Sequence, residues 1–204
     1  ADPWVALAAV AAATERIALG ALVTPLPRRR VHKLARETVT LDHLSGGRLI
    51  FGAGLGGDGH GEFEPFGEPA DPRERARLLD EGLERLAAYW ERDFRPPPVQ
   101  RPRIPVWVAG RWPMRRPLRR AAAWDGYFPI GELERPDQLA EAAAEIAALR
   151  EAGGSGSRPF DLVVTNPAGT DPAPWAGAGA TWCLTGFGPQ PRAAKVRDAI
   201  DAGP

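Results

Sequence analysis

Apolar residues recur along this chain of 204 residues in two alternating ways, as short continuous runs and as longer stretches with a helical period. Short apolar runs predict buried strands, here over residues 17–24, 48–53, 104–109, 127–130, 160–165 and 181–185. The periodic stretches predict helices over residues 3–14, 31–44, 71–90, 113–124, 136–152 and 191–202, with a weak helical turn at 172–179. Such alternation is typical of a parallel sheet with helices outside it, because parallel strands need a crossover connection.

Capping residues sharpen several of these boundaries. Asp71 is expected to cap the start of its helix in a pattern close to a capping box. Gly46 is expected to end the helix before it in a left-handed conformation. The loop at 58–70 carries Phe63 and Phe66, which we expect to anchor it.

Composition narrows the class of protein. The length suits one domain with a sizeable core. Lys plus Arg and Asp plus Glu both number 26, so bulk charge gives no argument for a nucleic-acid partner. The single cysteine, Cys183, excludes an internal disulfide and fits a reducing, cytoplasmic compartment; we expect it in the core. No apolar run approaches the roughly 20 residues of a membrane span, so no membrane partner is expected.

The chain resembles the luciferase-like monooxygenase family, also called the bacterial-luciferase or F420/FMN-dependent oxidoreductase superfamily. The likeness is carried by DPWVALAAVAAATERIALGALVTPLPRRR, KLARETVTLDHLSGGRL, EFEPFGE, RARLLDEGLERL, PRIPVWVAGRWP and RRAAAWDGYFP. It implies an α/β fold, a TIM (β/α)8-type barrel that binds FMN or coenzyme F420 and often forms a homodimer. Compared with the family, the first strand, first helix and second strand are missing. We therefore expect one barrel domain over 1–204, incomplete at its N-terminus, with about six parallel strands.

In a parallel barrel, ligands bind at the carboxyl ends of the strands. One such end is the run Ala109-Gly110-Arg111-Trp112, where a strand stops, glycine turns the chain and a helix is expected to begin at Pro113. Backbone N–H groups and a helix N-terminus there favour an anion, and the resemblance implies a flavin phosphate. The alternative is an ordinary strand-to-helix turn with nothing bound.

A second strand end is rich in glycine. Gly52, Gly54 and Gly57 match G-x-G-x-x-G, but a dinucleotide site needs a helix directly afterwards, and no helical pattern begins for more than a dozen residues. The interpretation we prefer is a flexible mouth loop beside the flavin ring, in which Gly54, Leu55, Gly56 and Gly57 contact the cofactor. Glycine permits such close approach to the backbone.

A third strand end is Thr24-Pro25-Leu26. In the family the backbone commonly bends there, often with a non-proline cis peptide, to form a bulge behind the flavin ring. The resemblance thus makes Thr24 and Leu26 candidates for that wall, and a plain proline-terminated strand is the alternative.

Few other residues suggest chemistry. His60, in the mouth loop, could meet the substrate, although a solvated loop histidine is the simpler interpretation. The basic clusters Arg28–Arg30 and Arg115–Arg116 are solvated faces by default, but they could attract an acidic cofactor tail or substrate. No HExxH, CxxC or similar spacing occurs, so no metal is predicted. Structural roles are expected for Asp42, Arg48, Trp124 and Asp125, which match the family away from the mouth.

The resemblance implies a flavin-dependent oxidoreductase or monooxygenase that acts on a small organic substrate, with or without molecular oxygen. No general base can be named, so the catalytic residues are unknown. Two alternatives stay open: a non-catalytic flavin-binding remnant of the fold, and a truncated product whose open sheet edges favour aggregation or dimerisation.

Overall fold

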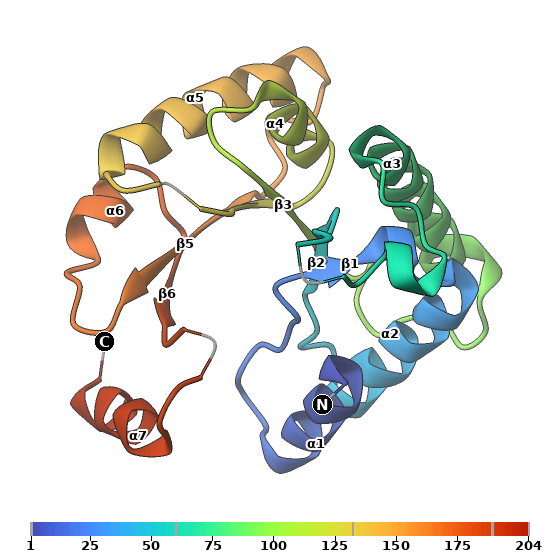
Figure 1. Ribbon diagram of the computed structural model, residues 1–204, viewed down its shortest axis with the longest axis horizontal. Helices are drawn as coiled ribbons and strands as arrows, with labels where there is room; N and C mark the ends of the chain where they lie inside the picture. The colour runs from blue at the N-terminus through green and yellow to red at the C-terminus, as the bar shows by residue number, and fades with distance from the viewer. Residues whose placement is uncertain (1, 60, 132, 189, 204) are drawn as a thin grey trace. The chain divides into compact units, whose positions relative to one another are not determined.

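The computed structural model in Figure 1 describes residues 2–59, 61–131, 133–188 and 190–203. The chain divides into two compact units, Ala1–Ala109 and Gly110–Pro204, here called the first and the second unit. Strand order equals chain order, β1-β2-β3-β4-β5-β6, and the pairings within each unit are parallel. The predicted alternation of parallel strands and helices is therefore confirmed.

The first unit contains the first helices and strands of the chain and three short helical turns. Its elements are α1 (Pro3–Ala13), β1 (Thr24–Pro25), the 3-10 turn η1 (Leu26–Arg28), α2 (Val31–Ser45), β2 (Phe51–Gly54), the 3-10 turn η2 (Glu64–Phe66), α3 (Pro72–Ala88), the π-helical turn η3 (Tyr89–Asp93) and β3 (Val106–Gly110), whose last residue opens the second unit. Asp71 caps α3 and Gly46 ends α2 with φ of 65°, as predicted.

The second unit continues the alternation. Its elements are α4 (Arg115–Ala122), β4 (Gly126–Pro129), α5 (Pro136–Ala152), β5 (Asp161–Pro167), α6 (Ala173–Gly177), β6 (Trp182–Gly186) and α7 (Ala193–Ala202). The bounds of α5 are those predicted from the sequence.

The apolar run at 17–24 does not form the continuous strand that was predicted. It pairs with its neighbour only through a bridge from Leu19 to Leu49 and through β1. Between these points the backbone presses against β2, so closely that a Cβ on Gly52 would overlap the carbonyl oxygen of Ala21. The peptide bond between Leu22 and Val23, within this segment, is cis.

Three aromatic rings contact one another in the core of the first unit. Phe51 of β2 stacks on Trp4 of α1 at 5.9 Å between centroids, and its other neighbour is Trp90, edge-on at 5.7 Å. Trp90 donates its indole N–H to the buried hydroxyl of Thr38 at 3.0 Å. The rings therefore fasten α1, α2 and η3 to one strand.

Two of the predicted structural residues secure the first unit away from its strand ends. Asp42 is fully buried, and its carboxylate accepts hydrogen bonds from the backbone N–H groups of Val99 at 2.7 Å and Gln100 at 3.2 Å. Arg48 donates to the carbonyl groups of Thr14 and Ile17, each at 2.8 Å. Their predicted structural roles are confirmed.

In the second unit the corresponding residue is Arg150 of α5, which is almost fully buried. Its guanidinium donates to the carbonyl groups of Trp124 at 3.2 Å and Ser155 at 2.9 Å. The carbonyl of Asp125 accepts the N–H of Asp161 at 2.8 Å. Trp124 and Asp125 thus serve structurally, through their backbones, as predicted.

Two predictions about burial are wrong. Phe66 does not anchor its loop, because 76% of it is exposed, whereas Phe63 is fully buried. Cys183 is exposed rather than in the core, because β6 pairs with β5 alone among the described residues and carries little packing.

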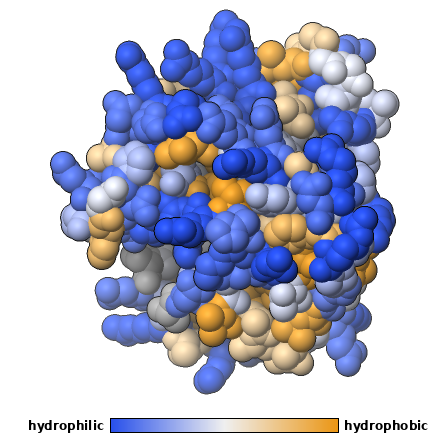
Figure 2. All heavy atoms as spheres, turned by 90° about the vertical axis from the view of Figure 1, so that its right-hand side faces the viewer, coloured by the Kyte–Doolittle hydropathy of each residue, from blue (hydrophilic) through white to orange (hydrophobic). Residues whose placement is uncertain are grey.

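The side of the molecule that carries α2 and α3 is mostly hydrophilic, with scattered hydrophobic patches (Figure 2).

Candidate functional site

A cavity of about 420 Å³ opens in the second unit at the carboxyl ends of β4 and β5. Its lining is mainly aromatic and aliphatic, with one hydroxyl and one carboxylate: Phe128, Ile130, Leu133, Val164, Trp175, Thr165 and Glu134. Trp175 and Val164 belong to a buried cluster with Leu139, so this wall is held rigidly. We call this the strand-end cavity; its position is the one at which parallel α/β proteins bind ligands.

The backbone turn after β3 lies beside this cavity. The carbonyl oxygen of Gly110 accepts the N–H of Ile130, a cavity residue, at 2.9 Å, and the hydroxyl of Tyr127 at 3.1 Å. On the other side, a Cβ on Gly110 would overlap Cβ of Pro117 in α4. The turn at 110–114, here called the Gly110 turn, is therefore fixed by contacts from both β4 and α4.

The helix after this turn begins later than predicted. Met114 donates its N–H to the carbonyl of Arg111 at 3.0 Å, which closes a turn before α4 starts at Arg115. Pro113 therefore lies in the turn and not at the start of the helix. The N-cap, Met114, makes no side-chain capping bond, so the first turn of α4 keeps backbone donors available to an anion.

The glycines of the first unit have a structural reason that the sequence did not reveal. A Cβ on Gly54 would lie 2.5 Å from Cγ2 of Val23, and one on Gly56 would lie 2.7 Å from Phe63. Gly56 also has a φ of 69°, where side chains are strained. Gly57 faces open space. Close packing of protein atoms, rather than a ligand, thus accounts for Gly54 and Gly56.

The mouth loop, residues 54–63, is packed against the protein at Gly56 and Phe63, and its predicted flexibility beside a flavin stays a prediction. Phe63 is fully buried beneath Gly56. Arg75 of α3, which is also buried, places its guanidinium 4.8 Å from the centroid of the Phe63 ring and donates to the carbonyl of Gly56 at 3.1 Å. Asp58 accepts the N–H of Phe63 at 2.8 Å.

In the described residues between β2 and Pro72 there is no α-helix. The prediction that no helix directly follows Gly52, Gly54 and Gly57, as a dinucleotide motif would require, is therefore confirmed. His60 lies outside the described residues, and its predicted role in meeting the substrate stays a prediction.

Thr24 and Leu26 differ in what surrounds them. Thr24 is 2% exposed at the end of β1, opposite Ala53, and its hydroxyl has no hydrogen-bond partner among the described residues. An orphaned buried hydroxyl fits a polar ligand group or a water molecule. Leu26 is buried against α3, where a Cβ on Gly82 would lie 2.9 Å from it. This contact accounts for Leu26, and its place in a cofactor wall stays a prediction.

The structure therefore groups the predicted residues into two sets. In the first unit, Thr24 pairs with Ala53 next to Gly54, and Ala109 is 3.7 Å from the Cβ position of Gly54. In the second unit, the carbonyl of Gly110 bonds to Ile130 of the strand-end cavity, and Arg111 and Trp112 follow Gly110 in the chain. Sequence reasoning identified the strand ends but missed Tyr127 and Trp175, because the pattern gave no sign of where their side chains lie.

Titratable groups add little to this geometry. Burial raises the pKa of Tyr127 above its ordinary value, so its hydroxyl stays protonated and donates. Within the described part of the chain, no three or more His, Cys, Asp or Glu side chains are arranged to hold a metal ion.

The sequence model of the luciferase-like monooxygenase family matches residues 1–173, and the chain belongs to this family, a class of oxidoreductases. An uncharacterized protein of Mycobacterium tuberculosis is 31% identical over 201 residues, which cover 91% of this chain and 69% of the relative.

Two solved structures show the same fold. The chain is similar to a monooxygenase from Streptomyces bottropensis, with a TM-score of 0.70, 25% identity, and coverage of 82% of this chain and 54% of that one. It is similar in fold to the coenzyme F420-dependent tetrahydromethanopterin reductase from Methanopyrus kandleri, with a TM-score of 0.66, 22% identity, and coverage of 82% and 55%. The chain thus spans about half the length of these structures, and its prediction as a luciferase-like barrel fold is confirmed.

Proposed function

We propose that this chain belongs to a flavin-dependent oxidoreductase or monooxygenase that uses FMN or coenzyme F420 on a small organic substrate. The observation that carries the proposal is the rigid Gly110 turn beside the strand-end cavity, at the carboxyl ends of parallel strands in a member of this family. The names of the two similar structures, a monooxygenase and an F420-dependent reductase, support the cofactor class and the reaction class.

The residues of the Gly110 turn fit a phosphate. The peptide from Gly110 to Arg111 is trans, so its N–H points opposite to its carbonyl. Because that carbonyl is bound from β4, the N–H of Arg111 points away from β4. With the uncapped first turn of α4 and its Arg115 and Arg116, these donors would hold the phosphate of the cofactor.

The residues predicted in the first unit are considered apart from the Gly110 turn, and their contact with a flavin ring stays a prediction. Thr24 offers a buried hydroxyl without a partner, and Gly57 offers an open approach to the backbone of the mouth loop. Leu55 and Ala109 complete the proposed set. A bound flavin would supply the hydride transfer or the oxygen activation, while the protein supplies orientation and exclusion of water.

The strand-end cavity fits a neutral and largely apolar substrate. Phe128, Ile130 and Trp175 would bury apolar surface of such a molecule, and Thr165 could donate to an oxygen. Glu134 is exposed at the cavity, where it would disfavour anionic substrates.

The same cavity supports a second candidate function, a flavin-binding protein without catalysis. Among the described lining residues Glu134 is the one ionisable side chain, so the cavity offers few groups for acid–base catalysis. Steady-state assays with reduced FMN or reduced F420 and a panel of apolar alcohols, ketones and alkenes separate the two. Turnover with either reduced cofactor supports the enzyme, whereas cofactor binding without turnover leaves the binding protein.

We also propose a cytoplasmic homodimer. None of the helices in the described residues combines the length and apolar character needed to cross a membrane. Helix α1 carries no charged residue and leaves Val5 72% and Val10 39% exposed, which supports burial against a second copy. Sedimentation equilibrium of the wild-type chain and of a Val5→Glu, Val10→Glu variant tests this proposal, because the variant should shift to monomer.

A further inference from the structure

We propose that Tyr127 is a positioning residue for the cofactor phosphate, acting through the Gly110 turn; this inference rests on the proposed function. Tyr127 lies in β4 and its side chain is fully buried. Its hydroxyl donates to the carbonyl oxygen of Gly110 at 3.1 Å. The residue itself does not belong to the strand-end cavity lining, so its effect on a ligand is indirect.

The hydrogen bond acts on an atom that controls the turn. The carbonyl oxygen of Gly110 has two lone pairs, and the N–H of Ile130 at 2.9 Å and the hydroxyl of Tyr127 occupy both. A carbonyl bound from two directions resists rotation of its peptide plane. Because the same plane carries the N–H of Arg111, Tyr127 fixes the direction of that donor.

The hydroxyl is better explained by positioning than by packing. Phenylalanine would fill the same buried space without the need to satisfy a polar atom, and a buried hydroxyl is retained at a cost unless it is bonded. The one acceptor that the structure gives for it is Gly110, at the end of the neighbouring strand. Burial raises the pKa of Tyr127 above its ordinary value of 10.0, so the hydroxyl, which is protonated at neutral pH, stays a donor into more alkaline solution.

The opposite side of the turn is restrained independently. Pro117 of α4 occupies the space that a side chain on Gly110 would need. The turn is therefore restrained from α4 by packing, and by two hydrogen bonds from Tyr127 of β4 and from Ile130 just after β4. Removing the hydroxyl leaves the packing and the Ile130 bond in place, so Tyr127→Phe is expected to fold and to loosen only the orientation of the peptide.

The test compares flavins with and without a phosphate. Wild-type and Tyr127→Phe chains are titrated with FMN and with riboflavin, with flavin fluorescence as the readout. The loss of one oriented donor is expected to raise the Kd for FMN about 3- to 10-fold and to leave riboflavin within twofold. If only F420 binds, the matched pair is F420 and its deazaflavin chromophore without the phosphate.

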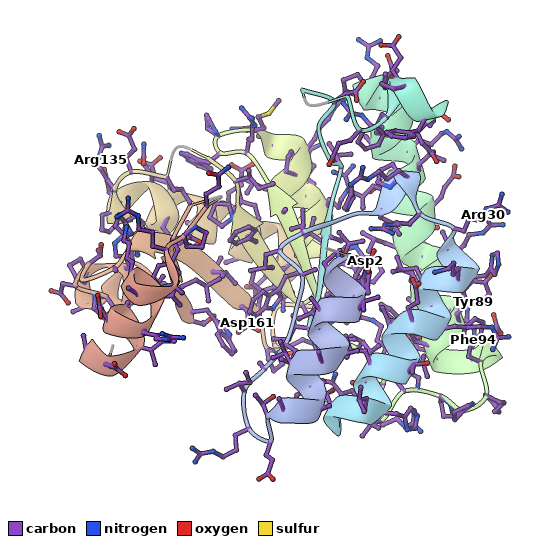
Figure 3. All side chains as sticks on the ribbon, turned by 60° about the horizontal axis from the view of Figure 1, so that its bottom comes forward. Asp2, Arg30, Tyr89, Phe94, Arg135 and Asp161 are labelled. Carbon is purple, nitrogen blue, oxygen red and sulfur yellow. The ribbon has the colours of Figure 1, made fainter. Side chains whose placement is uncertain are left out.

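Tyr89→Phe is the matched control, because the chain has two tyrosines and Tyr89 stacks on Phe94 at 4.8 Å in the first unit (Figure 3). Its affinity for both flavins should equal that of the wild type. Equal weakening of FMN and riboflavin in Tyr127→Phe, no change in either, or unfolding of that variant would each overturn the inference in favour of a purely structural tyrosine. If the wild-type chain binds neither a flavin nor a deazaflavin, the proposed function itself fails. Failure of the Tyr127 inference alone is recognised because the wild-type chain then still binds the cofactor.

Discussion

The guanidinium of Arg75 lies 4.8 Å from the centroid of the buried Phe63 ring while its Nη1 donates to the carbonyl of Gly56 at 3.1 Å. One side chain of α3 thus holds both ends of the mouth loop. Arg75 is 7% exposed and its Nε has no hydrogen-bond partner among the described residues, so its burial is costly, and these two contacts offset part of that cost.

Replacement of Arg75 by Gln should therefore destabilise the chain. The loss of the bond to Gly56 and of the cation–π contact predicts a decrease of about 1–3 kcal/mol in the free energy of unfolding. Urea denaturation followed by tryptophan fluorescence measures it. Arg77→Gln, on the exposed side of the same helix, removes ion pairs with Glu74 and Glu81 and should change little. Equal effects of the two variants would show that Arg75 does not hold the loop.

The glycines of β2 and of its loop give a sharper comparison. Gly54→Ala places a methyl group 2.5 Å from Val23, and overpacking of this kind costs about 1–3 kcal/mol. Gly57→Ala meets nothing within 4 Å and has no positive φ, so it should be neutral in stability. Thermal melts of both variants test this difference. A neutral Gly54→Ala would refute the close packing described for the segment before β1.

Arg150 is expected to contribute strongly to the stability of the second unit through its buried hydrogen bonds. Replacement by Met leaves the carbonyl groups of Trp124 and Ser155 without their donor and should cost about 2–4 kcal/mol in unfolding free energy. The exposed Arg135, labelled in Figure 3, provides the control; it pairs with Asp137 at 2.9 Å. Arg135→Met should leave the denaturation midpoint almost unchanged. Similar midpoints for the two variants would contradict the proposed role.

The cap of α3 predicts a pH dependence. Hydrogen bonds from the N–H groups of Glu74 and Arg73 lower the pKa of Asp71 below its ordinary 3.8. A lowered carboxyl pKa contributes stability above the ordinary pKa, and this stability is lost as the pH falls through the lowered value. Asp71→Ala should thus be less stable than the wild type at pH 7, with the difference shrinking below pH 3.8. Urea midpoints across this range measure it, and a constant difference would rule out the carboxylate as the cause.

Local signals explain what the sequence predicted well. Asp71 and Gly46 mark helix ends through interactions within a few residues, so their roles could be predicted without any tertiary contact. The strand predicted over 104–109 was found as β3, Val106–Gly110, whose residues are all buried. These elements fix where the strand ends fall, and hence where the candidate site lies.

The features that the sequence did not predict depend on contacts between residues distant in the chain. The 17–24 run is interrupted where the carbonyl oxygen of Ala21 closely approaches Gly52, and the reason for glycine at position 56 lies in its contact with Phe63. Tyr127 looked like any strand residue, because its importance lies in an acceptor 17 residues away. Periodicity reports which face is buried, and it carries no information on such partners.

The most direct test of the central claim is a titration of the purified wild-type chain with FMN and with coenzyme F420, followed by absorption and fluorescence. The account predicts that at least one of them binds at micromolar concentration, and that its phosphate-free counterpart binds more weakly. If neither cofactor binds at that concentration, the Gly110 turn and the strand-end cavity are not a flavin site.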